Sequence, residues 1–379
     1  MLDSLTMIPF RMHHILQILN SYEIERGALD LFISQYFKNN RALGSKDRKE
    51  ISTTIYALYR HLGKVNALSR RPLTWENRLK ALKQIDDDHP KLPPHVQVSF
   101  PQELFQLIAN HYGESSALEI CKTLNTEAPI TLRANEIKCT REELIATLSK
   151  QFRVSPSPHS PWAIHLEGRE QLFKTDAFKE GLFEIQDEAS QLAAALAGAK
   201  PGEHILDFCA GAGGKSLAMA PNMDGKGQIY LHDVREKALL QAKQRLKRAG
   251  AQNIQITLPG SKNLKRLTGR MDCVFVDAPC TGTGTYRRHP EQKWRFNSQM
   301  LGELVTKQRS IFESALTYMK PTGRIVYATC SILNEENMAQ IEHFLKEYDL
   351  AIAQEPLQIL PKPNQMDGFF TVVCKRKVC

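Results

Sequence analysis

The sequence predicts an α/β fold for its C-terminal half. A doubly wound, Rossmann-like parallel sheet is expected at 181–379, preceded by an all-α part at 1–90 and a small α+β part at 91–180. The sheet is predicted from apolar runs rich in Val and Ile and bounded by Gly or Pro, a pattern typical of parallel strands covered on both faces. Amphipathic helical segments alternate with these runs, as βαβ units require. The runs lie at 205–210, 227–233, 271–276 and 323–330.

The first part is predicted to be a small helical bundle. Ser45 is suited to cap a helix, and Ile51, Ile55 and Leu58 then recur at helical spacing. Lys and Arg fill the remaining positions, which fits a solvated basic face and a face that touches RNA equally well. An acidic, proline-rich stretch at 86–94 is typical of a linker.

The second part carries strand and helix signals in alternation. Residues 130–135 read as a strand, and Thr140 with Glu143 forms a capping box that opens a helix. A second strand-like run follows at 162–166. We therefore expect a small β-α-β unit here.

A glycine-rich turn at 211–216 follows the first strand of the C-terminal domain, and Asp233 ends the next strand about twenty residues later. Glycines let a ligand approach the backbone, and an acid at this place can accept hydrogen bonds from ribose hydroxyls. The turn has neither the P-loop spacing nor a full G-x-G-x-x-G, which argues against phosphate binding and NAD. A nucleoside cofactor without a pyrophosphate, such as S-adenosylmethionine, fits better. The candidate cofactor residues are Cys209, Ala210, Gly211, Gly213, Gly214, Lys215, Asp233 and Asp277.

Two cysteines follow neighbouring strand signals. Cys280 lies in the stretch 277–284, which starts with Asp277, and Cys330 ends the run 323–330. Ligands of open α/β sheets bind at the carboxyl ends of the strands, so both thiols are expected to face one crevice. A free Cys at a strand end is often only a small buried hydrophobe. The pairing of two such cysteines with an aspartate and a cofactor turn favours covalent chemistry instead.

A basic and aromatic loop at 286–296 follows the first of these cysteines. Guanidinium groups suit phosphates, and aromatic rings stack on unpaired bases. RNA contact is therefore predicted for this loop, with a merely solvated loop as the alternative. The candidate RNA-binding residues are Arg287, Arg288, His289, Lys293 and Trp294.

The composition limits the kinds of protein that this chain can be. The 379 residues are 42% hydrophobic and 24% charged, as in soluble globular proteins. We find neither an apolar run of about 18 residues nor a signal-peptide pattern, so a cytoplasmic protein without membrane association is expected. Eight cysteines without a C-x-x-C argue against zinc and against a disulfide framework, so no metal is predicted. The net charge of +9 favours a polyanionic partner, most commonly nucleic acid.

Several motifs in the C-terminal domain closely resemble those of the RNA (cytosine-5) methyltransferases. They are Gln186-Asp187-Glu188-Ala189-Ser190, the stretch from Asp277 to Gly284, Arg287-Arg288-His289-Pro290, Lys293-Trp294, Tyr327-Ala328-Thr329-Cys330-Ser331, Glu335-Glu336-Asn337 and Asp367-Gly368-Phe369-Phe370. The N-terminal part is more loosely similar to the NusB-type RNA-binding domain of the bacterial small-subunit ribosomal RNA methyltransferases in this family. The middle part is similar in position to the family's small RNA-recognition subdomain.

The resemblance implies a fold, a cofactor and roles for four residues. It implies an S-adenosylmethionine-dependent methyltransferase domain in which Cys330 is the nucleophile and Cys280 assists release of the product. Asp277 would bind the cytosine edge, and Lys215 would orient that aspartate. Reasoning from the residues alone does not order the two cysteines, because both lie at strand ends.

The implied substrate is RNA, in the first place ribosomal RNA, and a monomer is expected. A transfer RNA cytosine methyltransferase, a catalytically inactive RNA-binding assembly factor and a small-molecule methyltransferase are the alternatives. The family's usual Cys-Ala-Ala-Pro-Gly-Gly-Lys-Thr turn differs here at 209–216. The aspartate that the family uses to read the adenine has no clear match at 257–261.

Overall fold

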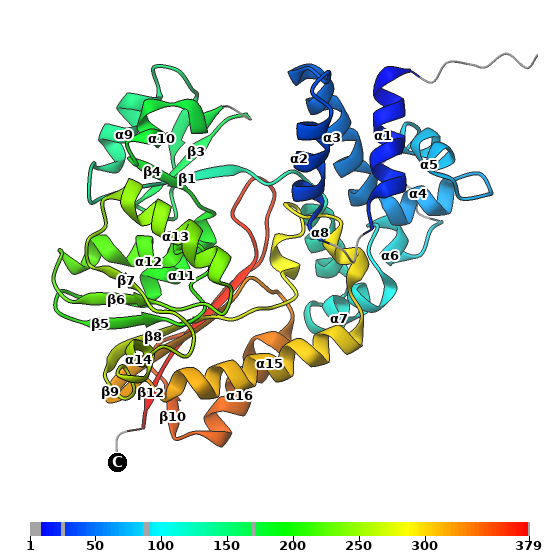
Figure 1. The fold of residues 1–379 in the computed structure, drawn as a ribbon. Helices are drawn as coiled ribbons and strands as arrows, with labels where there is room; N and C mark the ends of the chain where they lie inside the picture. Colours follow the sequence, from blue (N-terminus) through cyan, green and yellow to red (C-terminus); the bar gives the residue numbers. More distant parts are fainter. Residues whose placement is uncertain (1–8, 24–26, 86–90, 169–170, 378–379) are drawn as a thin grey trace, which may run out of the picture. The chain divides into compact units, whose positions relative to one another are not determined.

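The structure, a computed structural model, describes residues 9–23, 27–85, 91–168 and 171–377. Within them the chain folds into two compact units (Figure 1). The helical unit holds the chain up to Glu127 together with Thr285–Met300, and the catalytic unit holds Ala128–Gly284 and the chain from Leu301 onward. Residues 86–90 of the predicted linker lie outside the described residues.

The predicted bundle is present in the helical unit. The helix expected from Ser45 runs over Ser45–Arg60 and buries Ile51, Ile55 and Leu58 completely. Ser45 is its first residue, not its cap, and Asp47 instead accepts a hydrogen bond from the backbone N–H of Gly44 at 3.2 Å. The helices are α1 (Phe10–Ser21), α2 (Leu29–Asn39), α3 (Ser45–Arg60), α4 (Leu62–Leu68), α5 (Trp75–Leu82), α6 (Pro94–Gln97), α7 (Gln102–Tyr112) and α8 (Glu114–Leu124).

The helical unit continues beyond residue 90, where a domain boundary was expected. The helices α7 and α8 belong to it, as does the distant segment Thr285–Met300. That segment carries a short 3-10 turn at Gln292–Arg295. Its Trp294 packs on the hydrophobic core of the bundle, which is why a segment so far along the chain is part of this unit.

The catalytic unit begins with a small module built on a four-stranded antiparallel sheet. The order is β2 (Val154–Pro156), β3 (Ala163–Leu166), β1 (Ile130–Ala134), β4 (Phe183–Ile185). The predicted capping box is confirmed at α9 (Arg141–Leu148), where Thr140 accepts from the N–H of Glu143 and Glu143 accepts from that of Thr140. A short helix, α10 (Asp176–Lys179), precedes β4.

The large sheet of the catalytic unit has eight strands. Its parallel part has the order β9 (Met319–Thr329), β8 (Met271–Asp277), β5 (His204–Asp207), β6 (Gln228–Leu231), β7 (Ile254–Ile256). Antiparallel strands complete it next to β9: β12 (Phe369–Arg376), which pairs with β10 (Leu350–Ile352) and β11 (Leu357–Ile359). The predicted doubly wound α/β fold is therefore confirmed.

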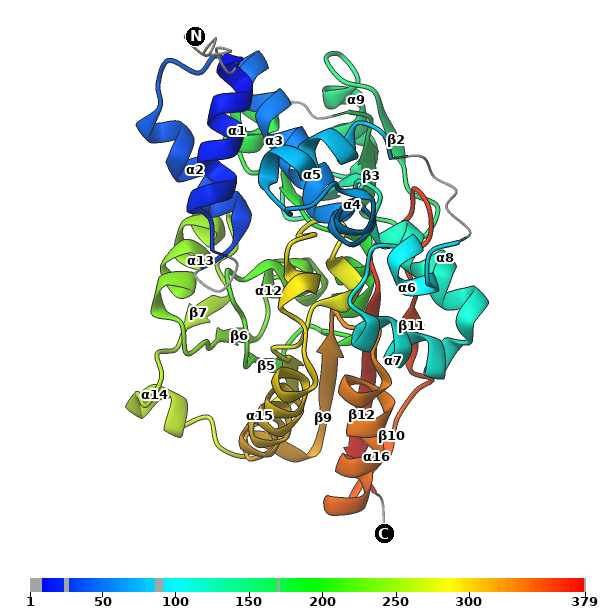
Figure 2. The same ribbon diagram turned by 90° about the vertical axis from the view of Figure 1, so that its right-hand side faces the viewer.

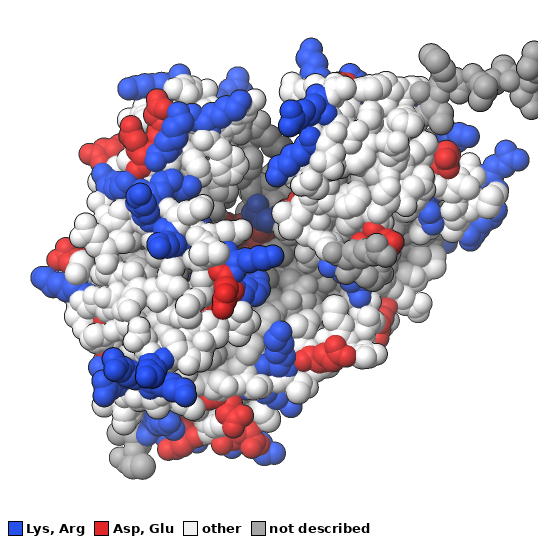
Figure 3. Space-filling model, in the orientation of Figure 1, with Lys and Arg blue, Asp and Glu red and all other residues white. Residues whose placement is uncertain are grey.

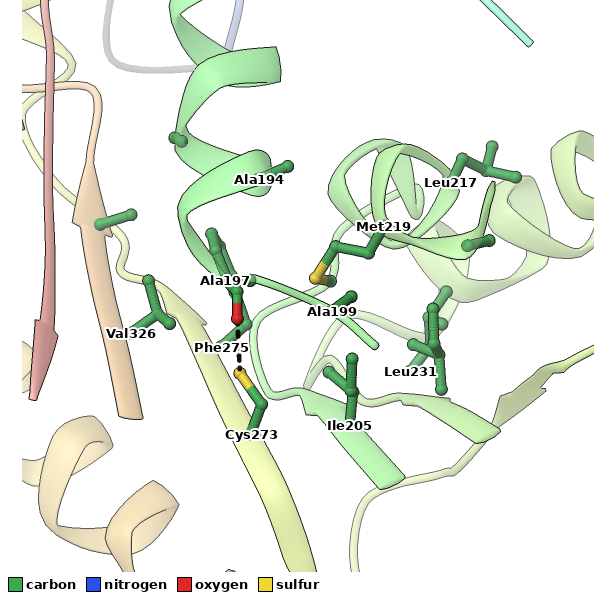
Figure 4. Packing of buried hydrophobic residues seen from close by; sticks show 14 of the residues in the cluster. Ala194, Ala197, Ala199, Ile205, Leu217, Met219, Leu231, Cys273, Phe275 and Val326 are labelled. Atoms are coloured by element: carbon green, nitrogen blue, oxygen red, sulfur yellow. Dashed lines mark hydrogen bonds between the residues drawn. The ribbon is translucent and has the colours of Figure 1, made fainter. Parts of the chain in front are cut away.

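Helices cover both faces of the large sheet. Neighbouring residues of one strand point to opposite cores, so that Cys273 and Phe275 pack on one side and Val274 and Val276 on the other. Figure 4 shows the first core, where the Cys273 thiol approaches the Ala197 carbonyl at 4.0 Å. This side is covered by α11 (Glu188–Leu196), α12 (Gly214–Met219) and α13 (Glu236–Ala249). The other side is covered by α14 (Lys262–Lys265), α15 (Ser298–Leu316) and α16 (Met338–Glu347), the last two seen beside β9 and β12 in Figure 2.

Candidate active site

The predicted cofactor turn connects β5 to α12. Gly211 and Gly213 adopt φ values of +54° and +76°, which side chains rarely tolerate. A Cβ at Gly213 would lie 3.0 Å from the side chain of Leu231, so the turn lies close against β6. The glycines are therefore needed both for the backbone conformation and for the packing.

Asp233 lies two residues beyond the end of β6 and closes the turn from that side. Its side chain is almost fully buried and accepts hydrogen bonds from Gly211 N at 2.8 Å and from Arg235 N at 2.8 Å. The Arg235 guanidinium donates to both carboxylate oxygens at 3.0 Å. Burial alone would raise the pKa of Asp233, but these hydrogen bonds outweigh burial and hold its pKa below the ordinary value. Asp233 is thus an anion fixed against the turn.

The two predicted cysteines come together at the carboxyl ends of neighbouring strands. In the parallel pair β8 and β9, Asp277 lies opposite Ala328, and Cys280 and Cys330 follow within three residues. Their sulfur atoms are 3.4 Å apart, and both residues are partly exposed. The hydrogen bond to Cys330, followed by burial, raises the pKa of Cys280 well above its ordinary value. Cys280 therefore keeps its proton and can donate it toward Cys330.

Lys215 and Asp277 form an ion pair beside the thiols. Lys215 Nζ lies 2.5 Å from Asp277 Oδ2, and their side chains are 12% and 32% exposed. Burial would lower the pKa of Lys215, but the charge of Asp277, its hydrogen bond and the charge of Asp207 together outweigh burial, and the net pKa is raised. The pKa of the adjacent Asp207 is raised to about 7 by burial, while its Oδ2 accepts from Ser216 Oγ at 2.6 Å. The site thus holds a fixed ammonium group whose charge interacts with Cys330.

A buried polar network supports the loop that carries Cys280. Glu336 accepts hydrogen bonds from Thr281 N and from Gln308 Nε2, both at 2.9 Å, and the same Gln308 amide donates to Pro279 O at 3.0 Å. Asn337 Nδ2 donates to Ser331 O at 2.9 Å and so fixes the residue after Cys330. Sequence reasoning missed these supporting roles. Glu336 and Asn337 were visible only as part of a motif, and Gln308 carried no signal in the sequence.

The structure contradicts part of the RNA-binding prediction for the loop at 286–296. Arg287 and Lys293 are buried, at 0% and 1% exposed. Lys293 Nζ donates to Arg60 O at 2.8 Å and to Asn125 Oδ1 at 2.5 Å, and Trp294 Nε1 donates to Tyr59 O at 2.8 Å. Buried side chains with these partners anchor the segment inside the helical unit, so Arg287 and Lys293 do not meet RNA in this conformation. RNA contact remains a prediction for Arg288, His289 and Trp294, which are partly exposed.

Exposed cations gather elsewhere on the catalytic unit. Figure 3 shows Lys and Arg side chains over α14, and Lys262, Lys265, Arg266 and Arg270 are all exposed in and after this helix. Among the described residues, no cluster of His, Cys, Asp or Glu could hold a metal ion. No helix in the same residues is long and apolar enough to cross a membrane.

A doubly covered parallel sheet with a glycine turn after its first strand and an acid after the second is the arrangement of a nucleoside-binding α/β fold, the class that includes the S-adenosylmethionine-dependent methyltransferases. The fold is shared with the crystal structure of a methyltransferase homolog protein from Pyrococcus horikoshii, at 25% identity and a TM-score of 0.68. The match covers 77% of this chain and all of that protein.

Family models and relatives narrow this class. A model described as 16S rRNA methyltransferase RsmB/F matches residues 194–375, and a model for the RsmF/B-like ferredoxin-like domain matches 100–172. The ribosomal RNA small subunit methyltransferase B of Pasteurella multocida is 31% identical over 347 residues, which cover 86% of this chain and 74% of the relative. The protein of the same name from Proteus mirabilis is 34% identical over 73% of this chain and 66% of its own length. The chain belongs to the RsmB/F family of 16S rRNA methyltransferases.

Proposed function

We propose that this protein transfers a methyl group from S-adenosylmethionine to carbon 5 of a cytosine in small-subunit ribosomal RNA, through a covalent adduct with Cys330. One observation carries the proposal: two cysteine sulfurs 3.4 Å apart at the carboxyl ends of β8 and β9, beside the Lys215–Asp277 ion pair. The choice of RNA is supported by the names of the relatives, which are ribosomal RNA small subunit methyltransferases.

The residues of the turn fit the cofactor. Gly211 and Gly213 give the turn a backbone conformation that brings it close to a ligand, and Asp233 can offer ribose hydroxyls the two acceptor positions that the exposed guanidinium of Arg235 now occupies. The residues proposed to hold the cofactor are therefore the turn at 209–215 with Asp233 and Asp277. When bound, S-adenosylmethionine supplies an electrophilic methyl group on a sulfonium.

A nucleophilic cysteine is needed because carbon 5 of cytosine does not accept a methyl group unaided. The Cys330 thiolate adds to carbon 6 and makes the ring an enamine, so that carbon 5 becomes nucleophilic. Asp277 holds the Watson–Crick edge of the base and stabilises the charge that develops on the ring. Lys215 keeps this carboxylate oriented, since its ammonium lies 2.5 Å from Asp277.

Release of the product requires loss of the proton on carbon 5 and elimination of Cys330. Cys280 is suited to assist because its pKa responds to the state of its neighbour. The first cause of its raised pKa is the hydrogen bond with Cys330. Once the Cys330 sulfur is bonded to carbon, that cause is gone and the pKa of Cys280 falls, so Cys280 loses its proton more readily and its thiolate is available to take the proton from carbon 5.

The test is a covalent trap. Cys280→Ala is expected to accumulate protein attached to RNA under denaturing conditions, because the adduct forms and is not released. Cys280→Ala combined with Cys330→Ala is expected to give none. The matched control is Cys139→Ala, which removes a partly exposed thiol of the small module that takes no part in the reaction.

Sequencing the attached RNA shows which of the candidate RNAs is the substrate. Attachment at one cytosine of small-subunit ribosomal RNA supports the proposal, and attachment to transfer RNA would replace the substrate while keeping the chemistry. If the folded Cys280→Ala protein binds S-adenosylmethionine but forms no adduct, the assigned cysteine roles are wrong, and an assembly factor without catalysis becomes the better interpretation.

A further inference from the structure

Two arginines donate to backbone carbonyl groups of the cofactor turn. Arg133 Nη1 lies 2.8 Å from Gly214 O, and Arg245 Nη1 lies 3.0 Å from Ala212 O. One arginine comes from β1 of the small module and the other from α13 of the large sheet. We propose that Arg133 and Arg245, joined through Glu184, are positioning residues that hold the cofactor turn, so that docking of the small module sets the affinity for S-adenosylmethionine.

Arg133 is a buried cation, which needs an explanation. Its side chain reaches out of the small module to Gly214 O and to the side-chain oxygen of Gln186, and the residue is only 4% exposed. Burial lowers the pKa of Arg133 to about 10, so the guanidinium is still charged at neutral pH. Burying a charge costs free energy unless it is paired and hydrogen-bonded. Arg133 bears this cost and directs its donors at the turn. Its burial is best explained by a role in holding the turn.

Glu184 connects the two arginines. It lies directly opposite Arg133 in the β1–β4 ladder and is itself 4% exposed. Its carboxylate accepts from Arg245 Nε at 3.1 Å and Nη2 at 2.9 Å, and Arg248 donates to its other oxygen. Two of the three donating nitrogens of Arg245 are therefore used to fix its orientation, and the remaining one holds Ala212 O.

Holding these carbonyls fixes two peptide planes of the turn. A peptide group is planar, so fixing the carbonyl of Ala212 also fixes the N–H of Gly213, which donates to Ala210 O at 2.8 Å. The second plane links Gly214 to Lys215, whose side chain forms the ion pair with Asp277. The two arginines therefore position both the backbone that faces the cofactor and the start of the Lys215 side chain.

The consequence is a link between the small module and the cofactor. Arg133 and Glu184 belong to the module, whereas the turn belongs to the large sheet, so a loosened module releases two carbonyls of the turn. Linkage is reciprocal, and bound cofactor should in turn stabilise docking of the module. This inference rests on the proposed function only in placing the cofactor at the turn.

The chain offers a matched control directly after the same strand. Asn135 is also 4% exposed, and its Nδ2 donates to Gly181 O and Ala249 O at 2.8 Å. It therefore ties the module to α13 without touching the turn. If the affinity for S-adenosylmethionine falls only because the module docks loosely, it should fall equally in Asn135→Ala.

The experiment is calorimetric binding of S-adenosylmethionine to the full chain without RNA. Arg133→Met and Arg245→Met are expected to raise the Kd by about tenfold or more, as loss of a hydrogen bond to a charged group predicts. Arg133→Lys, which keeps a positively charged donor group, should recover part of the affinity. Asn135→Ala should change the Kd by less than about twofold even where it lowers the melting temperature as much. Amide hydrogen exchange at 211–216 should be faster in Arg133→Met and in Arg245→Met, but not in Asn135→Ala.

The inference would be overturned if Arg133→Met and Arg245→Met bound S-adenosylmethionine with wild-type affinity. It would also be overturned if Asn135→Ala lost as much affinity as they do. If Arg133→Met does not fold, Arg245→Met and Arg133→Lys decide by the same criterion. Binding needs neither RNA nor catalysis, so the proposed reaction can fail while this inference holds. A wild-type protein that binds no S-adenosylmethionine would overturn both.

Discussion

Lys293 gives a quantitative test of the helical unit, because it is a buried amine whose hydrogen-bond partners are a carbonyl and an amide, not a carboxylate. Nζ donates to Arg60 O and to Asn125 Oδ1, and the residue is 1% exposed. Burial lowers the pKa of Lys293 well below its usual 10.5. The folded protein therefore holds Lys293 neutral at pH values where the unfolded chain holds it charged.

The sign and size of the pH effect follow from this difference. Between the lowered pKa of the folded state and the value near 10.5 of the unfolded state, unfolding takes up one proton. The free energy of unfolding should therefore rise with pH, by about 1.4 kcal/mol per pH unit in this window, and level off above it. Lys293→Met removes the titrating group, so the difference in stability between variant and wild type should change with this slope.

The assay is urea unfolding followed by tryptophan fluorescence at a series of pH values. The chain has three tryptophans, and in a Trp162→Phe background the remaining Trp75 and Trp294 both lie in the helical unit. Lys46→Met, at an exposed position of α3, is the control and should show no such slope. A difference between Lys293→Met and wild type that does not vary with pH would refute the reasoning. It would mean that Lys293 stays charged when folded, held by the Phe100 ring 4.4 Å from Nζ.

Two further predictions concern the loop of Cys280. Gly284→Ala would place a Cβ 2.3 Å from the backbone oxygen of Gly368, so the loop must shift. Single-turnover methyl transfer should therefore slow by about tenfold or more, while the Kd for S-adenosylmethionine should not change. Gly302→Ala, where a Cβ meets nothing within 4 Å, should leave the rate unchanged, and equal rates in the two variants would contradict the argument. Glu336→Ala leaves the buried Thr281 N–H without its acceptor and should lower the free energy of unfolding by about 1–3 kcal/mol in urea titrations. Because burial raises the pKa of Glu336, the free energy of unfolding of the wild type should fall as pH rises through that pKa. If the same fall is seen in Glu336→Ala, another group causes it.

The strands and the main helices could be predicted because their signals are local. Alternation along β8 places Val274 and Val276 in one core and Cys273 and Phe275 in the other, and a run apolar at every position is typical of this double burial. The segment at 285–300 could not be placed in the same way. Arg287 and Lys293 read as surface residues by type, and their burial depends on partners such as Arg60 and Asn125, which lie far away in the sequence.

The same distinction applies to the site. Cys280, Cys330, Lys215 and Asp277 could be found because their residue types carry chemistry and because each follows a strand or a glycine turn. The supporting roles of Glu336 and Gln308 could not be predicted, because ordinary polar residues become structural only through burial and geometry. Such supporting residues are invisible to a search by residue type, although they decide how accurately the reacting groups are held.

The separation of the two sulfurs is itself a consequence of strand register. Asp277 lies opposite Ala328 in the parallel pair, so Cys280 and Cys330 follow the same rung by three and two residues. The extra residue on the β8 side must be taken up by a bend, and the hydrogen bonds of Glu336 and Gln308 hold Thr281 and Pro279 there. The bend makes contact between the thiols possible, and their contact raises the pKa of Cys280. The protonation state proposed for catalysis therefore depends on a buried network that touches neither sulfur.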